Sequence, residues 1–125
     1  MLNGYSTIGT VLRTKIISKA NLGGVENFTG LTTIESFLQQ CNLSGTVDVS
    51  MFVITNKCKN VSRAFYINNN MTTLNISGWD LSGVTNSRDI FYGTNKLSTI
   101  IAIGCNEDTV SKLRSWKSQA TIVTE

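Results

Sequence analysis

Eight carboxylates and three cysteines are the side chains of this chain that could take part in acid–base or thiol chemistry. Histidine is absent, which excludes histidine general bases, catalytic triads that contain histidine, and metal sites with histidine ligands. Among the carboxylates, only Glu107 and Asp108 are neighbours in the sequence, and the first turn of a helix explains them better than acid–base catalysis. The residue types therefore predict a protein that is not an enzyme and has no catalytic residues.

The cysteines Cys41, Cys58 and Cys105 follow no metal-binding spacing, since no CxxC pair occurs. No histidine or cationic cluster lies close enough in the sequence to activate a thiol. We interpret the three as small buried apolar residues, with one disulfide plus one free thiol as the alternative. Because the glycine-containing stretches also lack the spacing of phosphate-binding loops, the sequence predicts no metal and no cofactor.

The charged residues are few and scattered. Eleven basic and eight acidic side chains give a formal net charge of +3, without the clustering that a nucleic-acid surface requires. The densest basic stretch, Lys57, Lys59 and Arg63, is interpreted as a solvated face in preference to an anion site. No segment approaches the ~20 apolar residues of a membrane span. We expect neither a nucleic-acid partner nor a membrane span.

An internal repeat organises the middle of the chain. Phe37, Phe65 and Phe91 lie 28 and 26 residues apart, and an apolar residue follows each of them. Further apolar positions recur in the same order after each phenylalanine. The three matching units are SFLQQCNLSGTVDVSMFVI (36–54), AFYINNNMTTLNISGWDL (64–81) and IFYGTNKLSTIIAI (90–103).

Each unit predicts the same local structure. Apolar residues three or four positions before each phenylalanine indicate a short helix or helical turn, and a polar corner follows. The segments TVDV, TLNI and TIIAI then alternate apolar and other residues, which is typical of a short strand with one buried face. Such a unit cannot cover its own apolar side and must stack on its neighbours.

We therefore expect an α/β fold, a leucine-rich-repeat-like solenoid of about three to four coils with a parallel sheet and short helices. An ordinary α+β domain with coincidental phenylalanine spacing is the alternative. Residues 1–125 are predicted to form a single repeat domain, with repeats over 31–105. Residues 1–30 would form an N-terminal cap or degenerate coil, and 106–125 a C-terminal helix–strand cap.

The C-terminal cap has its own signals. Val110 and Leu113 are at helical spacing, Asn106 is a suitable N-cap, and Glu107 and Asp108 fall in the first turn, where carboxylates favour the helix dipole. The segment ATIVT (120–124) after this helix predicts a final strand. Because the end of a solenoid exposes an apolar face, a cap of this kind is expected there.

The second and third units resemble a known family. AFYINNNMTTLNISGWDLSGVTN and DIFYGTNKLSTIIAIGC are similar to the units of BspA-like bacterial leucine-rich-repeat surface proteins, the variety with the MFYGCSSLTSLDLS-type repeat. The resemblance covers about residues 31–105. It departs from the pattern at Met71, where leucine is usual, and only Cys41 keeps the cysteine that follows the phenylalanine by four residues. The resemblance implies a cell-surface or secreted adhesion module of bacteria or their phages.

A candidate binding surface lies on the strands. Asp48, between Val47 and Val49, should point away from the core, and Asn75 is its counterpart in the second unit. The predicted binding residues on this exposed strand face are Asp48, Thr46, Thr73, Asn75 and Thr99. Phe52 and Trp79 share another column, which we interpret as core in preference to a carbohydrate platform.

These observations lead to one expected function and one alternative. The expected function is a non-catalytic recognition or adhesion module that binds a host protein or a glycan through an exposed solenoid face. The alternative is a structural or spacer repeat domain of a larger surface protein or a phage virion. The expected location is the cell surface or the secreted fraction if a signal peptide has been removed, and the sequence leaves the ligand and the oligomeric state open.

Overall fold

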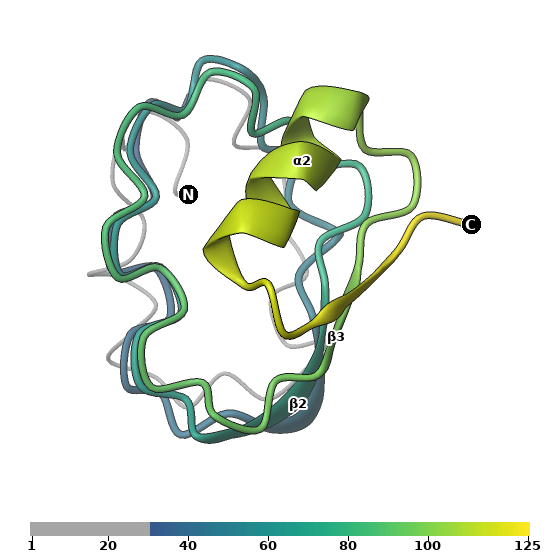
Figure 1. Cartoon of the computed structure of the whole chain (residues 1–125). Helices are drawn as coiled ribbons and strands as arrows, with labels where there is room; N and C mark the ends of the chain where they lie inside the picture. The colour runs from purple at the N-terminus through teal and green to yellow at the C-terminus, as the bar shows by residue number, and fades with distance from the viewer. Residues whose placement is uncertain (1–30) are drawn as a thin grey trace.

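The computed structural model describes residues 31–125, which form four parallel strands and one helix (Figure 1). The strands pair in sequence order as one sheet, β1-β2-β3-β4. Their bounds are Ser44–Asp48 for β1, Asn70–Asn75 for β2, Thr99–Ile101 for β3 and Thr121–Val123 for β4. Helix α2, Glu107–Trp116, lies between β3 and β4. The expected α/β class with a parallel sheet is thus confirmed, and the expected cap over 1–30 lies outside the described residues.

The strand register joins equivalent positions of the repeat. Val47 pairs with Leu74, Leu74 with Ile100, and Ile100 with Ile122. The first three of these side chains are buried, and Ile122 packs against the same core. Figure 1 shows successive passages of the chain following nearly the same path, with α2 across the C-terminal side. The sequence repeat therefore places equivalent positions on neighbouring, hydrogen-bonded strands.

Of the short helix or helical turn expected before each phenylalanine, the helix is wrong and only single turns form, as where the Phe37 N–H donates to the Ile34 carbonyl at 3.0 Å. The backbone N–H groups of Ile34, Ser36 and Leu38 instead donate to carbonyls 26 positions later, at Asn60, Ser62 and Ala64. Left-handed backbone at Ser36, Arg63 and Asp89 turns the chain so that these bonds can form. Bonds between units replace bonds within a helix, which a local sequence pattern does not reveal.

Aromatic rings form the centre of the core. Phe65 lies between Phe37 and Phe91, with ring centroids 6.2 and 5.8 Å away, and Trp79 stacks on it at 6.2 Å. Trp79 is 1% exposed and Phe52 is 2% exposed. The interpretation of Phe52 and Trp79 as core is therefore confirmed.

Helix α2 forms where the sequence predicts it. The Asn106 side chain accepts a hydrogen bond from the Thr109 N–H at 2.8 Å, and Glu107 and Asp108 occupy the first turn. The Thr109 hydroxyl accepts from the Leu81 N–H at 2.8 Å in a buried position. This last contact attaches the first turn of the helix to the end of the second unit.

None of the three cysteines forms a disulfide. Cys41 and Cys58 are buried and Cys105 is half-buried, so the interpretation as small apolar residues is confirmed for the first two. Burial raises the pKa of the Cys58 thiol above its ordinary value, and desolvation does the same at Cys105. Both thiols are accordingly protonated at neutral pH.

We expect Cys58 to be unreactive in the folded protein, because it is fully buried and only the thiolate is nucleophilic. An aromatic disulfide reagent at neutral pH should label Cys105 first and reach Cys58 only after unfolding. Labelling followed by peptide mass spectrometry measures this order. Reaction of Cys58 as fast as Cys105 under native conditions would show that the core around Cys58 is open.

Candidate functional site

The outer face of the sheet carries a column of threonines. Thr46 pairs with Thr73, Thr73 with Thr99, and Thr99 with Thr121, so one threonine from each strand lies in register. Thr46 and Thr121 are exposed and the two central threonines are half-buried. The structure thus brings together the three threonines predicted from sequence and adds Thr121. The TIV segment of β4, which matches TII of β3, is the signal that would have identified it.

A second column lies two residues further along the strands. Asp48 pairs with Asn75, Asn75 with Ile101, and Ile101 with Val123. All four side chains are half-buried, and the column changes from polar on β1 and β2 to apolar on β3 and β4. The face therefore offers hydroxyl, carboxylate, amide and aliphatic groups side by side.

Asp48 and Asn75 also hold the turn after their strands. The Oδ1 atom of Asp48 accepts from the N–H and hydroxyl of Ser50 at 2.9 and 2.6 Å. Asn75 accepts from Ser77 in the same way, at 3.0 and 2.7 Å. These are Asx turns, in which a short polar side chain replaces a backbone acceptor. Only the second polar atom of each side chain remains for a ligand, so both residues have a structural role beside the predicted one.

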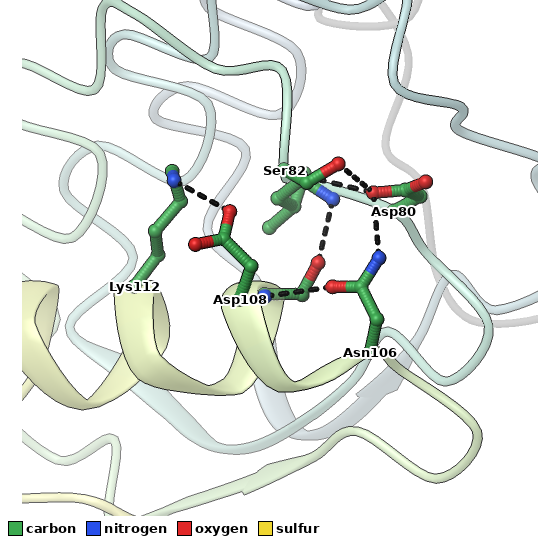
Figure 2. A network of polar contacts seen from close by, with 7 residues as sticks. Asp80, Ser82, Asn106, Asp108 and Lys112 are labelled. Carbon is green, nitrogen blue, oxygen red and sulfur yellow. Dashed lines mark hydrogen bonds and ion pairs between the residues drawn. The ribbon is translucent and has the colours of Figure 1, made fainter.

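Asp80 repeats this turn at the base of α2 (Figure 2). Its Oδ1 accepts from the N–H and hydroxyl of Ser82 at 3.0 and 2.6 Å, and from the Asn106 amide at 3.0 Å. The hydrogen bonds from Ser82, helped by Asn106, lower the pKa of Asp80 below its ordinary value. Asp108 and Lys112, also drawn, form an ion pair of 2.8 Å along the helix. These contacts fasten the cap and do not form a pair of carboxylates around a cleft.

The lowered pKa of Asp80 predicts an acid-sensitive contribution to stability. A carboxylate whose pKa is lower in the folded state stabilises the fold above its unfolded pKa of about 3.9, and loses that contribution as pH falls through the folded pKa. Asp80→Asn should preserve the turn, because Asn75 makes the same turn with Ser77. Urea unfolding between neutral pH and pH of about 3 should therefore show a shallower acid loss in the variant.

The control for this experiment is Glu125→Gln, which removes a carboxylate at an exposed position outside the turn. Its acid dependence should match that of the wild type. If Asp80→Asn and the wild type lose stability in parallel, the hydrogen bonds at Asp80 do not contribute in the way described.

The basic residues Lys57, Lys59 and Arg63 do not form one cluster in the structure. Lys57 and Lys59 are exposed beside a cavity of about 520 Å³, where the Lys59 ammonium donates to the Asn56 carbonyl at 3.2 Å. Arg63 does not line that cavity, and its guanidinium lies 5.4 Å from the centre of the Tyr66 ring. The three cations therefore do not form one anion site. Within residues 31–125, no three potential metal ligands gather.

Comparison with protein-family models, with curated proteins and with solved structures finds no match to this chain. In the part of the chain that the structure describes, no helix combines the length and apolar character needed to cross a bilayer.

Proposed function

We propose that this protein is a non-catalytic recognition module that binds a host protein or a glycan through the outer face of its sheet. The observation that carries the proposal is the in-register column Thr46, Thr73, Thr99 and Thr121 beside the mixed column that begins at Asp48. Threonine hydroxyls donate and accept hydrogen bonds without selecting one sign of charge. Parallel strands hold these groups at a regular spacing, about 4.8 Å between neighbours, which presents a rigid surface to a partner.

The proposal includes the finer architecture and family. We infer a leucine-rich-repeat-like solenoid of three to four coils, supported by the hydrogen bonds that join equivalent positions 25 to 27 residues apart, as from Val61 to Asn86 and at the Thr33–Asn60 bridge. The resemblance of the second and third units to BspA-like proteins supports a place at the cell surface or in the secreted fraction. Both inferences agree with an adhesive role.

The test is a binding screen with the purified, immobilised chain against a glycan array and a set of extracellular-matrix proteins. Thr73→Arg places a long cation in the middle of the threonine column, and Ser111→Arg places the same group on the exposed side of α2 as the matched control. A ligand of the outer face should lose at least about tenfold in affinity with Thr73→Arg, a loss of about 1.4 kcal/mol, and little with Ser111→Arg. Thermal melting of both variants verifies that they are folded.

A blank across both panels would contradict the recognition proposal and favour the structural or spacer role. Binding that Thr73→Arg leaves unchanged would place the ligand elsewhere on the molecule. Either result overturns the assignment to the outer face.

A further inference from the structure

A pair of stacked tyrosines lies away from the sheet, at the positions that follow Phe65 and Phe91. The rings of Tyr66 and Tyr92 are 5.3 Å apart at 20°. Tyr66 is half-buried, whereas Tyr92 is 61% exposed, the largest fraction among the exposed large apolar side chains of the described residues. One face of Tyr92 therefore rests on Tyr66 while much of the ring is open to solvent.

A cleft lies beside this open ring. It has a volume of about 350 Å³, and its walls include Tyr92 and, from the C-terminal end of α2, Trp116 and Lys117. This volume is at the lower end of the roughly 300–1,000 Å³ found for small-molecule sites. Trp116 is half-buried and packs against the core, so this wall is anchored. The cleft exists because the chain enters α2 after the third unit instead of adding another tyrosine to the stack.

Polar groups surround the aromatic rings of the cleft. Asp89, Ser87 and Gln119 also line it, and the side chains of Ser87 and Gln119 make no hydrogen bond within residues 31–125. The Asp89 carboxylate lies 3.9 Å from the Nε atoms of both Arg63 and Arg88, too far for short hydrogen bonds to them. The cleft thus offers hydroxyl, amide and carboxylate groups around an aromatic surface.

The charged side chains around the cleft favour some classes of ligand over others. Arg63, Arg88 and Lys117 outnumber the single carboxylate of Asp89 around the cleft, so an organic cation is disfavoured although tyrosine and tryptophan could hold one. A saccharide has both properties that the site requires. Its apolar C–H face can stack on an aromatic ring, and its hydroxyls can pair with amide and carboxylate groups.

We propose that the cleft between Tyr92 and the C-terminal end of α2 binds a saccharide, with one pyranose ring stacked on Tyr92 and its hydroxyls hydrogen-bonded to Asp89 and Gln119. The site is distinct from the outer face of the sheet, since none of the threonines of that face lines it. The protein would then have a saccharide site in addition to the binding surface on the outer face of its sheet.

The experiment is an NMR titration of the labelled chain with the methyl glycosides of glucose, galactose, mannose, N-acetylglucosamine and glucuronic acid, and with tetramethylammonium as the cation probe. At least one glycoside should shift the Gln119 side-chain amide and the Trp116 indole N–H, and tetramethylammonium should not. Tyr92→Ala should weaken that binding about tenfold, which is about 1.4 kcal/mol and lies at the upper end of the range for an aromatic contact. Tyr92→Phe keeps the ring and should bind within about threefold of the wild type.

Three outcomes would overturn the proposal: no glycoside shifts these resonances, only tetramethylammonium does so, or Tyr92→Ala binds like the wild type. Thr73→Arg is the matched control and should bind glycosides normally. The same variant is the one that should fail in the screen for the outer face, so the two proposals can fail independently.

Discussion

Replacing Phe65 with alanine should lower the free energy of unfolding by about 3–5 kcal/mol, the range for a large buried aromatic residue. Phe65 is 1% exposed and lies within ring contact of Phe37, Phe91 and Trp79. Its removal leaves a cavity that all three of those rings line. Because domains of this size are stable by only about 5–15 kcal/mol, the variant should be near the limit of folding.

Urea unfolding followed by tryptophan fluorescence measures this loss, with Tyr92→Ala as the control. Tyr92 is also an aromatic residue, at the position after the phenylalanine of its unit, but it is 61% exposed, so its truncation should cost no more than about 1 kcal/mol. A cost below about 1 kcal/mol for Phe65→Ala would mean that the ring stack is not the centre of the core.

Asn68→Ala should lower the free energy of unfolding by about 2–4 kcal/mol, because it leaves several buried backbone groups without partners. The Asn68 side chain is 0% exposed. Its oxygen accepts from the Leu43 N–H at 3.1 Å, and its amide donates to the carbonyls of Leu38 and Phe65 at 3.0 and 3.1 Å. It therefore joins the corner of the first unit to that of the second.

Asn68→Asp separates this explanation from a simple loss of packing. The substituted carboxyl would face two carbonyl oxygens, so its protonated form is favoured and its folded pKa should be higher than the unfolded value of about 3.9. The loss of stability relative to the wild type should thus be smallest at acidic pH and grow as pH rises through the folded pKa. Equal destabilisation at pH of about 3 and 7 would contradict the assigned hydrogen bonds. Asn69→Ala, at an exposed neighbour, is the control.

The strands and the cap were predictable from the sequence because their signals are local. The alternation in TVDV and TLNI places Val47 and Leu74 inside, and the structure pairs these two residues directly. Asn106 followed by Glu107 and Asp108 marks the start of α2 at the correct residue. Both features are determined by residues within a few positions of each other, so a single sequence is enough to predict them.

The corners were not predictable, since their hydrogen bonds join residues about 26 positions apart. Apolar spacing around Ile34 indicates a helix, but the Ile34 N–H donates to the carbonyl of Asn60, 26 positions later. Asn68, Asn69 and Asn70 are alike in sequence, yet only the first is buried, because the chain of the preceding unit supplies its partners. The cleft at Tyr92 likewise depends on where α2 replaces a further unit.

Threonine methyl NMR can show whether the outer face of the sheet recognises a partner, as we propose. Thr46, Thr73, Thr99 and Thr121 place one reporter methyl on each strand of that face. On addition of a ligand found in the screen, we expect shifts or broadening at Thr73 and Thr99, the two central positions, while Thr109, buried in the first turn of α2, stays unchanged. Shifts confined to α2 and its surroundings, with the threonine column unaffected, would show that the ligand does not bind the outer face.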